Sequence, residues 1–203
     1  MKLIFFKRTL IFKKNLFLLI YQKNMQQEIV VLIGGPSSGK TTLIEKLKEE
    51  GYVCYPEISR EIIREAQKKG IEQLFLEQPL VFSELLLEGR IKQYLAAKQE
   101  KAGIVFLDRG IPDILAYMNY IGDSYPAFFD EVCKTHMYTK LFILPTWKEI
   151  FVCDEERYES YEQAVLIEQH LLETYQKYGY KPIEVPKDTV EKRVAFIKSH
   201  LNV

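Results

Sequence analysis

Gly34-Gly35-Pro36-Ser37-Ser38-Gly39-Lys40-Thr41 follows the spacing G-x-x-x-x-G-K-[ST], and the residues on either side give this match its meaning. The apolar, β-branched run 29–33 precedes it and is typical of a buried strand. Residues 42–47 continue as an amphipathic helix. In this order, backbone N–H groups converge on phosphate oxygens at a helix N-terminus. The alternative is a glycine turn that merely precedes a helix, and these flanks disfavour it.

The glycine-rich loop, residues 34–41, together with Thr42, is therefore predicted to bind the phosphates of a nucleotide. Lys40 would reach the β- and γ-phosphates, and the Thr41 hydroxyl would be a ligand of Mg²⁺. Gly39 allows a close approach of the backbone that a Cβ atom would obstruct.

Composition limits the classes of protein that this chain can form. Its 203 residues, 47% of them hydrophobic, suit a single domain. The three cysteines lie far apart and the three histidines form no H-E-x-x-H motif, so neither a disulfide framework nor a zinc site is expected. A reducing cytosol fits this cysteine usage.

Charge is distributed unevenly along the chain. Lys and Arg number 28, as do Asp and Glu, but residues 1–24 hold six of the basic residues and no acid. Residues 25–203 therefore carry 22 basic and 28 acidic side chains, a net charge of about −6. An acidic body offers no electrostatic footprint for nucleic acid, so nucleic acid is not an expected partner.

Residues 1–24 differ in composition from the rest. Twenty of the 24 are Phe, Leu, Ile, Lys, Asn or Tyr, types that A/T-rich codons encode. We expect a non-native or disordered extension here, followed by one domain over residues 25–203. The apolar runs are too short to span a bilayer, and no small-residue cleavage site follows residues 16–20. The rival interpretation is a basic helix on a membrane surface, so a membrane contact is expected only if residues 1–24 are genuine.

After Met25 the sequence alternates between strand and helix patterns. Strands are predicted at about 28–33, 52–55, 103–108, 140–144 and 183–185. Helices are predicted at about 40–50, 58–69, 72–101, 112–121, 126–135, 160–178 and 190–201, with a break or restart at Pro79. This alternation predicts an α/β fold, a three-layer sandwich with a parallel five-stranded sheet. Ligands of such sheets bind beyond the carboxyl ends of the strands.

Asp108 ends the third predicted strand, and Arg109 follows it directly. An acid at this point of a P-loop protein holds Mg²⁺ through water. A hydrolytic motor usually places Glu beside that Asp to polarise water, whereas this chain has Arg109. The pair looks like the Asp/Glu-Arg pair of nucleoside and nucleotide kinases, in which the arginine faces the transferring phosphoryl group. A surface Asp-Arg turn is the alternative.

Glu57 follows the second predicted strand. In deoxynucleoside kinases, a Glu at this strand end accepts the proton of the substrate hydroxyl, so Glu57 is the candidate general base. Arg60 and Arg64 are four residues apart and share a helix face that could bind an acidic group of the acceptor. A solvated helix with pairs such as Glu61–Arg64 is the alternative, and it weighs more against Arg64 than against Arg60.

Arg157 lies between the fourth strand and the helix at about 160–178. P-loop kinases carry a mobile lid there, whose arginine closes on the phosphates and helps to exclude water. The acidic neighbours also suit a plain first turn of a helix. Pro186 follows the fifth strand, where kinases of this type hold the adenine. No [NT]-K-x-D motif follows a strand, so the guanine selection of Ras-like proteins is not expected.

Together these motifs resemble a family of small P-loop proteins labelled as AAA-type ATPases. The family groups with the ribosylnicotinamide kinase domain of bacterial NAD regulators and with an animal NTPase of photoreceptor-channel trafficking. Besides the glycine-rich loop, the resemblance rests on the motifs Pro56-Glu57-x-x-Arg60-Glu61, Phe106-Leu107-Asp108-Arg109-Gly110-x-Pro112-Asp113, Asp154-x-x-Arg157, Tyr178-Gly179-Tyr180 and Val185-Pro186. It covers about residues 28–200 and implies ATP, Mg²⁺ and a kinase-like site. No clear signature of a nicotinamide-riboside pocket is present, so the acceptor stays open.

The resulting prediction is a cytosolic kinase of the nucleoside-kinase type, which moves the γ-phosphoryl group of Mg·ATP to a small, nucleoside-like hydroxyl acceptor. The predicted catalytic residues are Lys40, Glu57, Asp108, Arg109 and Arg157. Thr41 and Asp108 would serve Mg²⁺, and Arg60 would join Glu57 at the acceptor. The predicted nucleotide-binding residues are Gly34, Gly35, Pro36, Ser37, Ser38, Gly39, Lys40, Thr41, Thr42 and Pro186.

Two alternatives remain beside the kinase. One is a nucleotide-dependent ATPase or GTPase switch, or adaptor, that acts through a partner. The other is a membrane-bound lipid or trafficking factor, which depends on residues 1–24 being genuine. Arg109 in place of a glutamate favours phosphoryl transfer over hydrolysis.

Overall fold

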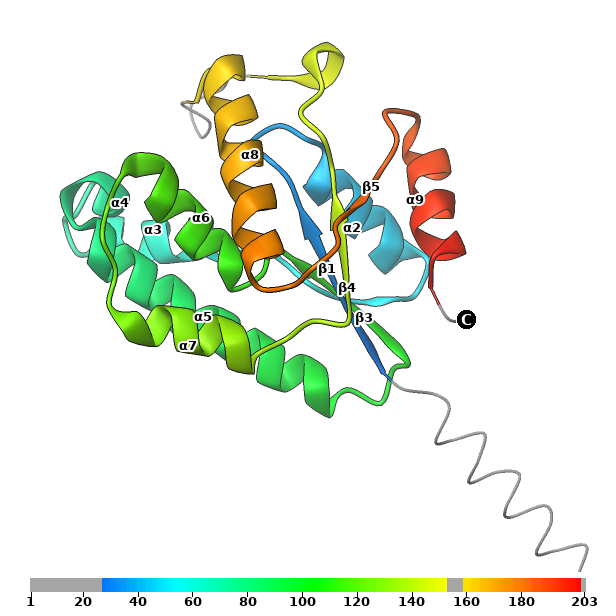
Figure 1. Cartoon of the computed structure of the whole chain (residues 1–203), viewed down its shortest axis with the longest axis horizontal. Helices are drawn as coiled ribbons and strands as arrows, with labels where there is room; N and C mark the ends of the chain where they lie inside the picture. Colours follow the sequence, from blue (N-terminus) through cyan, green and yellow to red (C-terminus); the bar gives the residue numbers. More distant parts are fainter. Residues whose placement is uncertain (1–26, 153–158, 202–203) are drawn as a thin grey trace, which may run out of the picture.

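The computed structural model describes residues 27–152 and 159–201 of the chain. The predictions for residues 1–24 and for Arg157 lie outside the described residues. Strands and helices alternate along the chain, as Figure 1 shows. In the two described ranges, no helix is both long enough and apolar enough to cross a membrane.

The described strands form one parallel sheet in the order β2-β3-β1-β4-β5. Their bounds are Glu28–Ile33 for β1, Val53–Tyr55 for β2, Ile104–Asp108 for β3, Lys140–Ile143 for β4 and Ile183–Glu184 for β5. The helices are α2 Lys40–Glu49, α3 Ser59–Lys68, α4 Leu74–Glu77, α5 Pro79–Gln99, α6 Pro112–Ile121, α7 Ala127–Thr135, α8 Tyr161–Lys177 and α9 Val190–Ser199, with a 3₁₀ turn, η1, at Lys148–Ile150. The predicted α/β fold with five parallel strands is confirmed.

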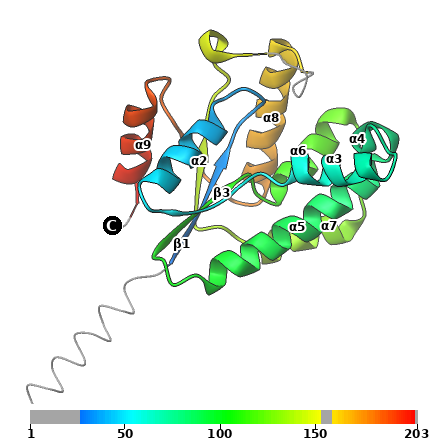
Figure 2. The same ribbon diagram turned by 180° about the vertical axis from the view of Figure 1, so that it is seen from behind.

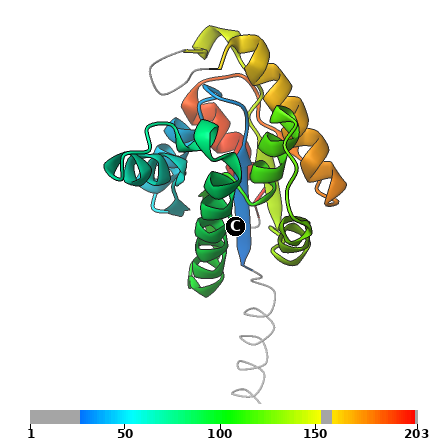
Figure 3. The ribbon, with the colours of Figure 1, turned by 90° about the vertical axis from the view of Figure 1, so that its left-hand side faces the viewer.

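Strand β1 lies at the centre of the sheet and is buried on both faces. Ile29, Val31 and Ile33 pack among apolar side chains of α5, α6, α7 and α8. Val30 and Leu32 pack on the opposite face, among residues of α2 and α9. Figures 1 and 2 show these two helix groups on either side of the sheet, and Figure 3 shows β1 (blue) through the middle of the domain. The alternation along one strand thus produces the three layers.

The break predicted at Pro79 within the helical stretch 72–101 is confirmed, because α4 ends at Glu77 and Pro79 begins α5 as its first residue. Two other predicted elements are longer than the observed ones. The predicted strand at 183–185 keeps only two residues in the sheet. The helix predicted at 160–178 ends at Lys177, and Gly179 follows in the left-handed conformation, with φ +83°.

The order of the strands positions the candidate site. Strands β2, β3 and β1 are neighbours and parallel, so their carboxyl ends meet at the same edge of the sheet. The chain after β2 carries Glu57, β3 ends in Asp108, and the chain after β1 enters the glycine-rich loop. Three motifs that are distant in sequence therefore come together there.

Candidate functional site

The glycine-rich loop passes closely beneath two neighbouring segments. A Cβ atom at Gly34 would lie 2.5 Å from the carbonyl oxygen of Leu144, and one at Gly35 would lie 2.9 Å from that of Ala164. Gly39 has φ +82°, which only glycine adopts readily, and helix α2 begins at the next residue. The N–H groups of the first turn of α2 thus face the loop, as an anion-binding helix terminus requires.

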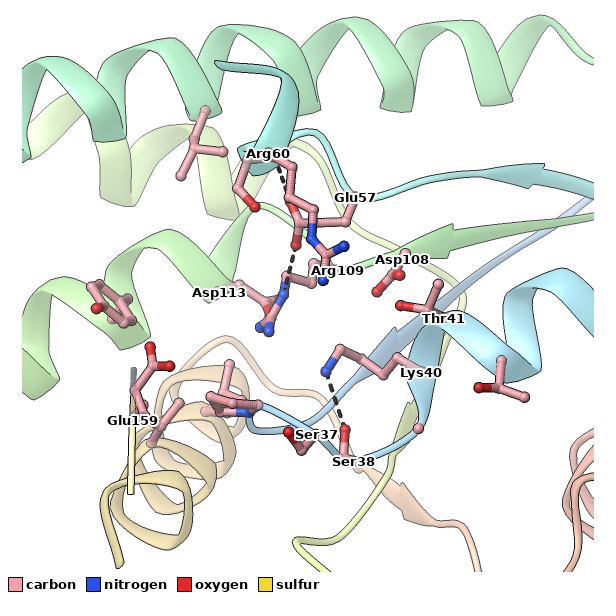
Figure 4. Close-up of a pocket in the computed structure, with 18 of the residues that line it drawn as sticks. Ser37, Ser38, Lys40, Thr41, Glu57, Arg60, Asp108, Arg109, Asp113 and Glu159 are labelled. Atoms are coloured by element: carbon pink, nitrogen blue, oxygen red, sulfur yellow. Dashed lines mark hydrogen bonds and ion pairs between the residues drawn. The ribbon is translucent and has the colours of Figure 1, made fainter. Parts of the chain in front are cut away.

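The side chain of Lys40 is buried inside this loop. Its Nζ donates hydrogen bonds to the carbonyl oxygens of Gly34 at 2.7 Å and Gly35 at 2.9 Å, and to Oγ of Ser38 at 3.1 Å, as Figure 4 shows in part. Burial lowers the pKa of Lys40 to about 7, and the positive charge of Arg109 acts in the same direction. The ammonium therefore lacks a strong anionic partner, which a bound phosphate would supply.

Asp108 and Thr41 provide oxygen atoms suited to Mg²⁺. Asp108 is 5% exposed, and its Oδ1 is buried with no hydrogen-bond partner among the described residues. Burial raises the pKa of this carboxyl, while the charge of Lys40 opposes the shift. Thr41 lines the same cleft, and its side chain is exposed there. Mg²⁺ usually takes one or two carboxylates together with water and substrate phosphates, so this donor set fits the ion.

A closed metal cage is not present in the described part of the chain. No group of three or more His, Cys, Asp or Glu side chains could hold a metal ion there. A Mg²⁺ ion that arrives with nucleotide phosphates needs no such cage.

Arg109 occupies a strained position directly after β3. Its φ is +72°, a conformation that non-glycine residues rarely adopt. Its Nε lies 2.6 Å from Oε2 of Glu57, and its Nη1 lies 3.0 Å from Oδ1 of Asp113. Burial alone would lower the pKa of Arg109, but the carboxylates of Glu57 and Asp113 raise it above its ordinary value. Strain at such a point is characteristic of functional sites.

Glu57 is held by four donors. Its Oε1 accepts hydrogen bonds from the backbone N–H groups of Ile58 at 2.9 Å and Ser59 at 3.0 Å. Arg90 Nη2 lies 3.3 and 3.4 Å from the two carboxylate oxygens, and Arg109 contacts Oε2. Burial acts to raise the pKa of Glu57, but the charges of Arg90 and Arg109 outweigh it and lower the pKa. Glu57 is therefore ionised at neutral pH.

These residues line one cleft of about 720 Å³. One end is mostly apolar and is built by α3, α4, α5, α6 and α8, with side chains that include Ile63, Phe75, Phe82, Leu86, Ile114 and Ile167. The other end is built by the segment after β4 and by the start of α9, with Trp147, Ile150, Asp188, Thr189, Val190 and Arg193. We call these the apolar end and the Trp147 end. The glycine-rich loop, Asp108 and Arg109 line the same cleft.

The structure brings most of the predicted site residues together. Residues 36–42, Glu57, Arg60, Asp108 and Arg109 line the cleft, while Gly34 and Gly35 lie buried at the base of the loop. Arg64 and Pro186 are exposed and do not line it. Instead of Pro186, the chain after β5 contributes Asp188 and Thr189, because the exposed loop turns into the cleft only there. Arg157 falls outside the described residues.

Sequence reasoning missed two buried arginines. Arg90 in α5 is 4% exposed, and Arg193 in α9 is 3% exposed. Nη2 of Arg193 donates to the carbonyl oxygen of Ser38 at 3.2 Å, and its guanidinium lies 5.9 Å from the centre of the Trp147 ring. Arg90 lies on the buried, mostly apolar face of α5 with Leu87, and Arg193 lies on that of α9 with Val194. A permanent cation on a core stripe was the available signal, because such a charge needs a partner.

Comparison with known proteins agrees with this description. Residues 29–193 match the family described as an AAA domain (AAA_28), which is more than half of the chain, so the protein belongs to this family. No curated protein matches the sequence. The predicted resemblance to small P-loop proteins with an AAA label is confirmed.

Solved structures of P-loop kinases share the fold. Deoxyadenosine kinase from M. mycoides has a TM-score of 0.64 at 16% identity, over 84% of this chain and 97% of that one. Thymidylate kinase from Ehrlichia chaffeensis has a TM-score of 0.56 at 18% identity, over 86% and 98%. The NadR protein in complex with NR has a TM-score of 0.64 at 17% identity, over 85% of this chain and 49% of that one. At these identities, the likeness establishes the fold alone.

Proposed function

We propose that this protein is a kinase that transfers the γ-phosphoryl group of Mg·ATP to a hydroxyl group of a small, nucleoside-like acceptor. The observation that carries the proposal is the arrangement of one cleft. A glycine-rich loop with a buried lysine lies on one side, and an ionised glutamate paired with an arginine lies on the other. A P-loop hydrolase has no need of an ionised carboxylate in the cleft beside its glycine-rich loop, other than the one that serves Mg²⁺.

The donor would bind along the glycine-rich loop. The loop amides and Lys40 would hold its phosphates, and the purine would lie at the Trp147 end, where an aromatic ring and the guanidinium of Arg193 offer flat surfaces. Asp108 and Thr41 would hold Mg²⁺, which neutralises charge on the β- and γ-phosphates when it is bound.

Glu57 would accept the proton of the acceptor hydroxyl. Its carboxylate lies just after β2 in the cleft and is oriented by Arg90 and Arg109, so its oxygens are fixed before the acceptor binds. Arg109 would then stabilise negative charge on the phosphoryl group in transit. Proton transfer would occur late, because a carboxylate with a lowered pKa is a weak base toward an alcohol in its ground state.

The acceptor end favours an alcohol over a phosphorylated acceptor. Glu57 is paired with Arg90 and Arg109, and the Asp113 carboxylate is paired with Arg109. Arg90 and Arg109 are therefore already neutralised by carboxylates, whereas an acceptor phosphate needs cations of its own. Apolar walls such as Phe75 and Phe82 suit a flat ring. Arg60, at the start of α3, is the side chain proposed to contact a polar group of the acceptor.

The test is a search for the phosphorylated product. Protein is incubated with γ-labelled ATP, Mg²⁺ and a pool of small metabolites, and labelled organic phosphates are identified by mass spectrometry. We expect label in a new phosphate ester, and none with Lys40→Ala. Label found only in inorganic phosphate, at equal rates in wild type and Glu57→Gln, would replace the kinase with a nucleotide-dependent switch. A second incubation compares nucleosides with nucleoside monophosphates, and we expect transfer to the former.

A further inference from the structure

Arg90 connects two strand ends that carry the candidate chemistry. It lies in the middle of α5, and only 5% of its side chain is exposed. Its Nη1 donates to the carbonyl oxygen of Gly110 at 2.7 Å, while its Nη2 lies 3.3 Å from Oε1 and 3.4 Å from Oε2 of Glu57. One guanidinium therefore spans the chain after β2 and the turn after β3.

The turn that Arg90 contacts is fixed from both sides. The Gly110 carbonyl accepts from Arg90, and the Gly110 N–H donates to Oδ2 of Asp113 at 2.9 Å. Arg109, with its strained φ of +72°, lies directly before these two bonds. A Cβ atom at Gly110 would lie 2.5 Å from the hydroxyl of Tyr175, so a residue larger than glycine does not fit at this point of the turn. A strained residue persists only where its surroundings hold it in this way.

We propose that Arg90 is a positioning residue, which holds the Glu57 carboxylate and the turn of residues 108–110 at a fixed separation. Its effect on turnover rests on the proposed function, whereas its hold on Glu57 does not. The role needs an arginine, because two partners lie in different directions and only a planar fork reaches both. Lysine at this position would contact one partner at a time.

Helix α5, which carries Arg90, also lines the apolar end of the cleft. The same helix contributes Phe82, Ser83 and Leu86 to the apolar end of the cleft, one and two turns before Arg90. The side chains that would touch the acceptor and the side chain that orients its base thus belong to one rigid element. A helix shift caused by a poorly fitting acceptor would move Arg90 and disturb Glu57.

The charges that act on Glu57 come from four sides. Arg90 approaches from α5 and Arg109 from the turn after β3, and both lower the pKa of the carboxyl. Lys40 from α2 and Asp108 from β3 also interact with it electrostatically. Loss of the Arg90 charge removes one of the groups that oppose the effect of burial and leaves Arg109 and the Ser59 N–H, so we expect the pKa of Glu57 to rise.

The first experiment measures the Glu57 carboxyl directly. Protein labelled with ¹³Cδ-glutamate is titrated by NMR, and the Glu57 signal is assigned from its absence in Glu57→Gln. We expect the Glu57 midpoint to move to higher pH in Arg90→Gln and, by less, in Arg90→Lys. Lys92→Met, which removes an exposed charge from the same helix, should leave it unchanged. Wild-type midpoints in either Arg90 variant would overturn the proposal.

The second experiment measures turnover with the acceptor found above. We expect Arg90→Gln to lower kcat by about 10²-fold, as small misplacements of reacting groups do, with Mg·ATP binding within twofold of wild type. Arg90→Lys, which has the better prospect of an intact fold, should lose less. A wild-type kcat in both variants would overturn the proposal. A wild-type protein that transfers no phosphoryl group would instead contradict the proposed function, and the NMR titration would still decide the role of Arg90.

Discussion

Nε of Arg109 lies 2.6 Å from Oε2 of Glu57, so the candidate base after β2 and the arginine after β3 form one ion pair across neighbouring strands. Each residue stabilises the charged form of the other, because Arg109 lowers the pKa of Glu57 and Glu57 raises that of Arg109. Substitution of either one therefore leaves the other charged group without this partner.

Glu57→Gln should suppress phosphoryl transfer while Mg·ATP affinity stays nearly unchanged. The amide keeps the size of the side chain but cannot accept a proton, and loss of general-base assistance typically costs about 10²–10⁴-fold in rate. That range corresponds to roughly 3–5 kcal/mol of activation free energy. Single-turnover rates and nucleotide binding, measured on the same preparation, separate the two effects.

The matched control is Glu61→Gln, an exposed glutamate on the first turn of α3. It should transfer phosphoryl groups at the wild-type rate. If Glu57→Gln also retains the wild-type rate, Glu57 is not the base, and its role is limited to its contacts with the two arginines.

Mg·ATP should raise the Tm of the wild-type protein, and Lys40→Ala should abolish the increase. A ligand that binds only the native state stabilises it by about 2.7 kcal/mol at a concentration of 100 Kd. Lys40 is already directed into the glycine-rich loop by the carbonyl groups of Gly34 and Gly35, so its truncation removes the cation at the phosphates. Differential scanning calorimetry with and without the nucleotide provides the measurement.

Lys48→Ala is the control for that experiment, because Lys48 is exposed on the same helix. It should keep the full increase in Tm. An unchanged wild-type Tm with millimolar Mg·ATP, and equally with Mg·GTP, would mean that the loop does not bind nucleotide.

Trp147 should report directly on the purine, because it is the single tryptophan of the chain and lines the cleft. Its ring lies beside the guanidinium of Arg193, which contacts the loop through Ser38. We expect Mg·ATP to change the intrinsic fluorescence, and inorganic triphosphate with Mg²⁺ to change it much less. Equal responses to both ligands would place the base away from Trp147.

The sequence was sufficient to predict those parts of the site that are encoded locally. Asp108 ends its strand, Glu57 and the glycine-rich loop come within two residues after theirs, and parallel strands bring their carboxyl ends to one edge. The buried run of β1 and the alternation of strands and helices likewise predicted the three layers, because both patterns are local in the sequence. Such features need no knowledge of how distant helices pack.

Arg90 and Arg193 depend on packing that local patterns do not encode. Arg90 meets Glu57 across 33 positions of sequence, and Arg193 meets Ser38 across 155. Helix periodicity places both on buried faces but gives no partner for either. The requirement for glycine at position 110 could likewise not be predicted from local patterns, because it comes from Tyr175 and Tyr138, which lie in other segments of the chain.

Asp130→Asn should lower the free energy of unfolding at neutral pH, because Asp130 joins helix α7 to the end of helix α8. Oδ1 of Asp130 in α7 accepts from Lys177 Nζ at 2.8 Å and from Tyr178 Oη at 2.6 Å, both at the end of α8, and Lys134 pairs with Oδ2. Helix α8 carries Ile167 into the cleft. Because 23% of the Asp130 side chain is exposed, solvent screens these contacts, and we expect a loss of about 1 kcal/mol, or a few degrees in Tm.

The pH dependence of this loss gives the sharper test. Hydrogen bonds from Lys134, Lys177 and Tyr178 lower the pKa of Asp130 below its ordinary value in the folded state. A carboxyl with a lowered folded pKa stabilises the protein above its unfolded pKa, about 3.9, and this stabilisation is lost as pH falls toward the folded pKa. The difference in Tm between wild type and Asp130→Asn should therefore be constant from pH 7 to about pH 5 and should narrow below about pH 4. A difference that persists undiminished at pH 3 would show that the asparagine disturbs packing between α7 and α8, and that the charge of Asp130 is not what joins them.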